Sequence, residues 1–316
     1  MLYNIAMLFN FVITDSCLLP TENPNAPIQV FVAPNETERL YLVGELNLDE
    51  HTLSSALDPD ELSRVEFEPT HVAIIFKRPQ HYTADNDFLF RVSSMGLYLF
   101  KDRLIAVMND DPSFFDRGKD FSNITGGLPE LLIRLITRSI SQFLGHIKAI
   151  SMVVDELEKK LETTMNNKHL LHLFKLSQSM TYYLSAISAN GVLIDKLRGY
   201  SAKIGFTTEH NELLEDLNVD NTQCYKQAEI YSVIMAGLMD ARASVVNNNL
   251  NMLMKRLTVL SIVFLPLNVI ASVFGMSEYS EFTKPIPWPI SYFLFGVALV
   301  GAGYLTFWLL KRSGMD

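Results

Sequence analysis

The sequence predicts an α/β domain followed by long stalk helices and two C-terminal transmembrane helices. Three observations support this: short β-type runs near the N-terminus, apolar residues at helical spacing through the middle, and two uncharged segments near the C-terminus. Hydrophobic residues make up 48% of the 316 residues and charged residues 19%. This balance is typical of a chain that combines a water-exposed part with a lipid-facing part.

The first 128 residues are predicted to form a cytoplasmic α/β domain. Residues 1–14 are rich in strand formers, lack Lys and Arg before the apolar run and are too short to span a membrane. We therefore expect a buried first strand there instead of a signal peptide. Residues 96–108 place a charged triplet between two apolar runs, which predicts a hairpin. Further strand-sized runs cover residues 28–33, 39–43, 71–76 and 88–92.

Helical spacing of apolar residues begins after Pro129, a residue that suits the first turn of a helix. Residues 129–210 are predicted to form a cytoplasmic helical hairpin, whose second helix covers about residues 170–200. A third helix begins near Asn211, forms a stalk over residues 211–256 and continues into the first membrane segment. Helices this long need partners to bury their apolar faces.

Two segments have the length and composition of membrane spans. Residues 257–274 carry no charge over about 18 positions, and residues 290–310 carry none over about 21. Trp288 and Trp308 stand near the ends of the second segment, as in interfacial aromatic belts. The sequence therefore predicts two spans joined by an extracytoplasmic loop at residues 275–289.

The distribution of basic residues predicts how the spans are oriented. Basic pairs stand at residues 255–256, before the first span, and at 311–312, in the tail 311–316. The connecting loop carries only Lys284. The positive-inside rule therefore places both termini in the cytoplasm of a multi-pass protein of the cell (inner) membrane.

Polar groups in and beside the first span suggest a hydrated path. Asn268 is costly against lipid and Pro266 removes a helix hydrogen bond, so we expect both to face away from acyl chains. Either a water-filled path or a packed helix interface would provide hydrogen-bond partners for the Asn268 side chain. In a ring of subunits, Glu278 and Glu281 would concentrate cations at the outer mouth, with an ordinary soluble loop as the alternative.

Several other classes of function are disfavoured. A net charge of −9 without a basic run argues against a nucleic-acid partner and makes cations better partners for the surface. Cys17 and Cys224 have no neighbouring ligands at metal-binding spacing. No phosphate-binding loop or nucleophile motif occurs, so we predict neither an enzyme nor a resident cofactor.

The first span and its approach resemble the CorA family of magnesium and divalent-cation transporters, which includes ZntB-like members. The resemblance rests on Asn-Asn-Leu-Asn-Met-Leu-Met-Lys-Arg-Leu-Thr at 248–258, then Pro266, then Phe-Gly-Met at 274–276. The family signature ends in Gly-Met-Asn, and that Asn is thought to receive hydrated magnesium at the outer mouth. Here Ser277 replaces it. Its shorter hydroxyl side chain still accepts from metal-bound water but would widen the ring and weaken discrimination.

The resemblance implies a funnel-shaped homopentamer in the lipid bilayer, with the first span of each subunit lining a central gated pore and the second packed outside. The resemblance implies Mg²⁺ as the transported ion, with Zn²⁺, Co²⁺ or Ni²⁺ as alternatives. The same ion is also a candidate regulatory ligand of the protein. Candidate pore-lining residues, at spacings of three, four or seven, are Asn251, Met254, Thr258, Leu265, Asn268 and Ser272; candidate mouth residues are Gly275, Met276, Ser277, Glu278 and Glu281. For Met254 and Leu265, ordinary packing in the core of the helix bundle is the alternative.

Three stalk acids receive candidate roles from the same resemblance. Residues 237–240 resemble the family's Gly-Leu-Leu-Asp, which makes Asp240 the candidate for an acidic ring at the cytoplasmic pore exit. Asp216 and Asp220 are candidates for a regulatory metal between neighbouring domains, with an ordinary solvated helix face as the alternative. Two other functions stay open: proton-coupled transport of zinc or another transition metal, and a non-conducting oligomeric membrane scaffold or regulator.

Overall fold

Seven strands form one mixed sheet in the order β2-β1-β3-β7-β6-β5-β4. The computed structural model describes residues 7–80, 89–110, 112–115, 121–161, 167–274, 281 and 283–312. β3 and β7 run parallel, and all other neighbouring strands are antiparallel. The strands are β1 (Met7–Thr14), β2 (Cys17–Pro20), β3 (Ile28–Val32), β4 (Arg64–Phe67), β5 (Val72–Pro79), β6 (Val92–Leu99) and β7 (Leu104–Met108).

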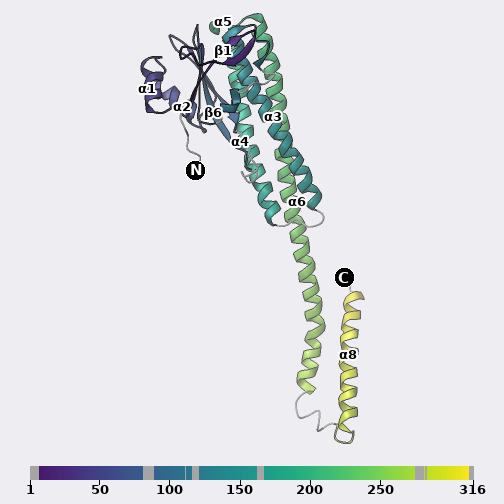
Figure 1. The fold of residues 1–316 in the computed structure, drawn as a ribbon. Helices are drawn as coiled ribbons and strands as arrows, with labels where there is room; N and C mark the ends of the chain where they lie inside the picture. Colours follow the sequence, from purple (N-terminus) through teal and green to yellow (C-terminus); the bar gives the residue numbers. More distant parts are fainter. Residues whose placement is uncertain are drawn as a thin grey trace. The chain divides into compact units, whose positions relative to one another are not determined.

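The central strands β3, β5, β6 and β7 are buried on both faces, and alternate side chains of β7 enter different cores. In β7, Leu104, Ala106 and Met108 join a large core, while Ile105 and Val107 join a smaller one. Helices α1 (Glu36–Gly44) and α2 (Glu50–Leu57) cover the smaller core, and α3 (Gly127–Leu161) and α4 (Asn167–Gly199) cover the larger (Figure 1). The result is a three-layer α/β arrangement.

The remaining elements are the 3-10 turn η2 (Pro112–Phe115), α5 (Ser201–Ile204), α6 (Thr208–Phe274) and α8 (Trp288–Arg312). The chain divides into two compact units, Met1–Met239 and Asp240–Asp316, and the boundary falls inside α6. Within the first unit, the beginning of α6 contributes to the large core. Its buried residues there are Leu214, Leu217, Cys224, Ala228, Met235 and Leu238.

Most predicted elements are confirmed, and two are wrong. The first strand, the strands near residues 28 and 71, the hairpin and all the long helices are present. Contrary to the prediction of a buried first strand, only Phe11 of β1 is buried, because β1 lies beside the edge strand β2. Residues 39–43 lie in α1 instead of a strand, because Asn35 and Glu38 form a capping box that starts a helix. In the predicted strand 88–92, only Val92 belongs to a strand, and Phe88 lies outside the described residues.

Candidate functional site

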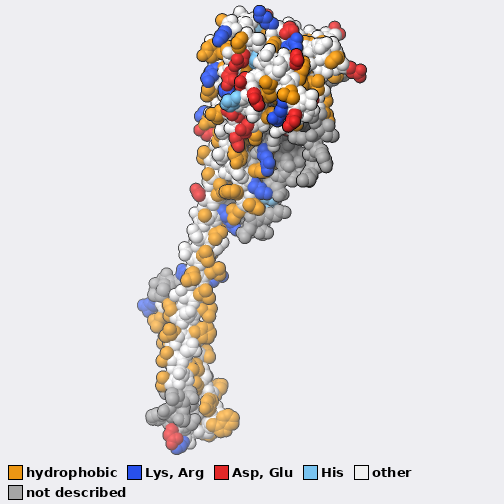
Figure 2. Space-filling model, turned by 90° about the vertical axis from the view of Figure 1, so that its left-hand side faces the viewer, with side chains coloured by type: hydrophobic (Ala, Val, Ile, Leu, Met, Phe, Trp, Pro, Cys, Tyr) orange, Lys and Arg blue, Asp and Glu red, His pale blue; other side chains and the backbone are white. Residues whose placement is uncertain are grey.

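The second unit contains two helices that are long and apolar enough to cross a membrane, the later part of α6 and α8. In the most apolar stretch of α6 no residue is buried, and in the most apolar stretch of α8 only 6% of the residues are buried. The core helix of a soluble protein would be mostly buried, so these surfaces call for lipid or partner helices. In Figure 2, apolar side chains cover this segment and charged ones gather near its ends.

The apolar stretch of α6 has two different faces. Half-buried residues recur along one of them, and one of these, Leu267, lies against Gly303 of α8: a Cβ added at Gly303 would lie 3.4 Å from Leu267 Cδ1. α8 therefore covers this face, and the small size of Gly303 permits the close approach. The half-buried residues are Val259, Val263, Pro266, Leu267 and Ile270.

The six candidate pore-lining residues lie on the other face, and all of them are exposed. At about 100° per residue, they fall within an arc of about 100° centred opposite the α8-facing side. The Thr258 hydroxyl donates to the carbonyl of Met254 at 2.8 Å, which satisfies it within the helix. The Asn268 side-chain amide makes no such bond with any residue that the structure describes. The amide of Asn268 therefore needs hydrogen bonds from water or from another chain.

The candidate mouth is only partly described. Gly275, Met276, Ser277 and Glu278 lie outside the described residues. Glu281 is exposed and forms an ion pair with Lys284. This pairing reduces the negative charge that Glu281 brings to the loop, an effect that the sequence pattern alone does not reveal.

The three stalk acids lie along α6. Asp240 and Asp216 are exposed and Asp220 is half-buried, one turn after Asp216. Across the described ranges, no group of three or more His, Cys, Asp or Glu side chains gathers to hold a metal ion. Within the described residues these three acids therefore do not gather into one metal site.

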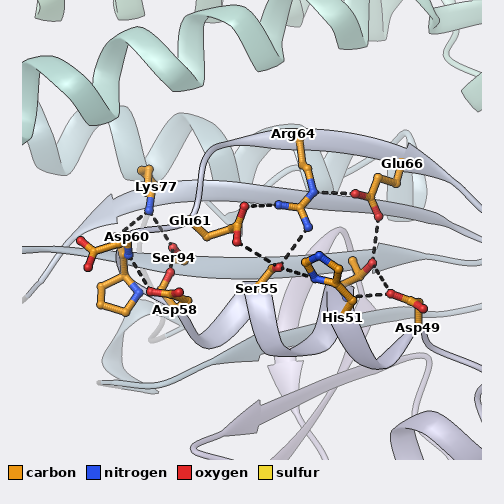
Figure 3. A network of polar contacts seen from close by, with 12 residues as sticks. Asp49, His51, Ser55, Asp58, Asp60, Glu61, Arg64, Glu66, Lys77 and Ser94 are labelled. Carbon is orange, nitrogen blue, oxygen red and sulfur yellow. Dashed lines mark hydrogen bonds and ion pairs between the residues drawn. The ribbon is translucent and has the colours of Figure 1, made fainter.

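An extended polar network ties α2 to the sheet in the first unit (Figure 3). Arg64 pairs with both Glu61 and Glu66 at 2.5 Å. Burial opposes the charged form of Glu61, but the Arg64 guanidinium and the Ser55 hydroxyl prevail and lower its pKa. The backbone N–H of Thr52 bonds Asp49 at 2.8 Å and lowers the pKa of that carboxyl. These acids already have partners, so the network is structural.

Lys77 extends the same network into the sheet interior. Its ammonium donates to the carbonyl of Pro59 at 2.6 Å and to the Ser94 hydroxyl at 3.0 Å. Burial lowers the pKa of Lys77, and the nearby carboxylates of Asp60 and Asp58 work in the opposite direction. Sequence reasoning missed this network. The Arg64-x-Glu66 spacing on one strand face was the available signal.

Comparison with known proteins decides the family. The model of the CorA-like Mg²⁺ transporter protein family matches residues 30–312. The chain belongs to this family. CorA proteins are transporters of divalent cations and not enzymes, and the two apolar helices fit a membrane protein.

Individual relatives agree. The cobalt/magnesium transport protein CorA of Methanocaldococcus jannaschii is 25% identical over 292 residues, covering 89% of this chain and 88% of the relative. The complete structure of the CorA magnesium transporter from that organism matches with a TM-score of 0.77 at 20% identity over 100% of both chains. The ZntB cytoplasmic domain of Vibrio parahaemolyticus matches with a TM-score of 0.60 at 11% identity, and the match covers 77% of this chain and 98% of that domain. These structural likenesses show the fold.

Proposed function

We propose that this protein forms a homopentameric, gated pore that carries divalent cations, with Mg²⁺ as the main cargo, down their electrochemical gradient. The two-faced membrane part of α6 supports this most strongly. α8 covers one face, while the face with Asn268 and Thr258 is exposed. A ring of five copies would turn that face toward a shared aqueous axis, where water satisfies the Asn268 amide.

The proposed pore alternates polar and apolar stations. Asn251, Thr258, Asn268 and Ser272 would contact the hydration shell of the ion, because Mg²⁺ sheds its waters reluctantly. Met254 and Leu265 would form narrow apolar rings that gate by excluding water. Residues 275–278 with Glu281 would form the outer mouth, where Ser277 replaces the family asparagine.

The charges at the ends of the spans support an orientation with both termini in the cytoplasm. Lys255 and Arg256 precede one span, and Lys311 and Arg312 end the other, where the Arg312 guanidinium lies 5.4 Å from the centre of the Trp308 ring. In this orientation Asp240 would ring the cytoplasmic exit. Asp216 and Asp220 would meet a regulatory ion between neighbouring subunits.

Flux into proteoliposomes tests the proposal. Purified protein in vesicles that hold an Mg²⁺-sensitive dye should raise the internal Mg²⁺ concentration when a Mg²⁺ gradient or an inside-negative potential is applied. Flux equal to that of empty vesicles for every divalent ion would contradict the proposal. Zn²⁺ flux that requires an imposed pH gradient would instead support the proton-coupled alternative.

The Ser277→Asn variant tests the scaffold alternative in the same assay. A pore that already conducts should keep a high flux after the substitution. A large gain of Mg²⁺ flux after Ser277→Asn would indicate a pore that Ser277 impairs, and no flux before or after the substitution would favour the scaffold.

A further inference from the structure

A cavity of about 650 Å³ lies in the first unit, where two tight turns of the sheet meet the start of α3 and α5. The turns connect β4 to β5 and β6 to β7. The cavity is of the size that proteins use for small organic ligands, about 300–1,000 Å³. The function proposed above does not use it.

The floor of the cavity is held rigidly. The Glu68 N–H donates to the His71 carbonyl at 3.0 Å and closes one turn, and the Phe100 N–H donates to the Arg103 carbonyl at 2.9 Å and closes the other. The turns lie side by side because Val72 pairs with Leu99 in the β5–β6 register. A ligand would therefore meet a preformed surface.

That floor is aromatic. The His71 ring stacks on Phe100 with ring centres 4.7 Å apart and an interplanar angle of 30°. His71 is only 5% exposed, and burial lowers its pKa, so its imidazole is neutral at neutral pH. Phe100 is half-buried and lines the cavity, with the buried His71 ring stacked behind it. This neutral aromatic surface favours a ligand that also carries a planar ring.

The wall is cationic. Lys203 of α5 places its ammonium 3.8 Å from the centre of the Phe67 ring, whose edge-on neighbour is Tyr200. Lys101 lines the opposite turn and is exposed. Neither lysine forms an ion pair with a carboxylate in the part of the chain that the structure covers, and Glu68 is the one acid among the described lining residues.

This arrangement excludes several ligands. The two ammonium groups, which have no carboxylate partner among the described residues, repel a divalent cation, although the chain as a whole has a net charge of −9. A purely apolar ligand would remove the ammonium groups from water without a counter-charge. A bare inorganic anion would leave the aromatic floor uncovered.

We propose that this cavity binds a nucleotide: the base lies against the Phe100 ring, which His71 supports from behind, and the phosphates lie between Lys101 and Lys203. Stacking and ammonium–phosphate attraction would each supply part of the affinity. The cavity would thereby give the cytoplasmic unit a ligand different from the transported ion.

Binding of fluorescent N-methylanthraniloyl-ADP to the full-length protein in detergent micelles tests this proposal without measuring transport. Saturable binding should be displaced by ADP, and much less well by adenosine or pyrophosphate alone. Lys101→Gln and Lys203→Gln should each weaken binding about 5- to 20-fold, because each removes one charge-assisted contact. Phe100→Leu should weaken it by a similar factor.

Lys148→Gln is the matched control, since Lys148 is exposed on α3 and outside the cavity. It should leave affinity unchanged, and Lys148→Gln, Lys101→Gln and Lys203→Gln should all unfold at the wild-type temperature. No saturable binding at millimolar nucleotide would overturn the proposal. So would wild-type affinity in both cavity lysine variants, or pyrophosphate competing as well as ADP while Phe100→Leu has no effect.

Discussion

The Asn190 side chain hydrogen-bonds both backbone groups of Lys77. Its Oδ1 accepts from the Lys77 N–H at 2.8 Å, and its Nδ2 donates to the Lys77 carbonyl at 2.8 Å. The Ser63 hydroxyl also donates to Asn190 Oδ1 at 2.8 Å. Asn190 is fully buried, so this one amide fastens α4 to β5 and to the start of β4.

Replacing Asn190 with Ala should therefore destabilise the first unit. The buried Lys77 N–H would lose this partner, at a cost of about 2 kcal/mol, which lowers the unfolding midpoint by roughly 4–8 °C. Thermal unfolding followed by circular dichroism measures the change. Gln178→Ala, at an exposed position of the same helix, is the control and should shift the midpoint little. Equal midpoints for the two variants would show that the Asn190 bonds contribute nothing.

Gly126 is predicted to be a position where only glycine fits. A Cβ there would run into the imidazole of His210, which is buried and accepts from the Thr207 N–H at 3.1 Å at the start of α6. Gly126→Ala should lower the unfolding midpoint. Gly145→Ala, in open space on α3, should raise stability by about 0.5–1 kcal/mol because alanine favours the helix. The two substitutions acting in the same direction would contradict the packing described.

The two cysteines should differ sharply in reactivity. Cys224 is fully buried, and desolvation, reinforced by Asp220, raises the pKa of its thiol to about 12. Cys17 is half-exposed. At pH 8, Ellman's reagent should titrate one thiol in the native protein and two in denaturant. In Cys17→Ser the native count should fall to zero, and a remaining reactive thiol would mean that Cys224 is accessible.

Protonation of His71 should weaken the first unit. Burial lowers its folded-state pKa below the ordinary 6.5, so the native state binds fewer protons than the unfolded chain as pH falls below that value. Stability is then full above about pH 7 and lost toward lower pH, by at most about 1.4 kcal/mol per pH unit. Denaturant unfolding of wild type and His71→Phe between pH 7.5 and 5 isolates this contribution. As the pH falls, the free energy of unfolding of His71→Phe should rise relative to that of the wild type. A difference between the two proteins that stays constant with pH would refute the prediction.

The long elements could be predicted from the sequence because each depends on a pattern within the element itself. Uncharged runs and helical spacing identify α3, α4, α6 and α8 without knowledge of their partners. α1 was missed because its apolar run at 40–43 is strand-sized. The capping box formed by Asn35 and Glu38 was the overlooked signal.

Features that depend on distant residues could not be predicted. The Asn190–Lys77 contact joins positions 113 residues apart, and nothing in either local pattern indicates it. The cavity beside His71 likewise requires four separate segments to meet. By contrast, the spacing of Thr258, Leu265 and Asn268 already placed them on one helix face, and the structure shows α8 on the other side.

Water access at position 268 tests the central claim most directly. Asn268→Cys and Leu260→Cys, each in a Cys17→Ser background, would be treated in proteoliposomes with a cationic, membrane-impermeant methanethiosulfonate and analysed by mass spectrometry. Leu260 is exposed on α6 but lies off the stripe that carries Asn268. We predict rapid modification at position 268, with loss of the remaining Mg²⁺ flux, and little at position 260. An unreactive thiol at position 268, or equal modification at both positions, would contradict an aqueous path along this face of α6.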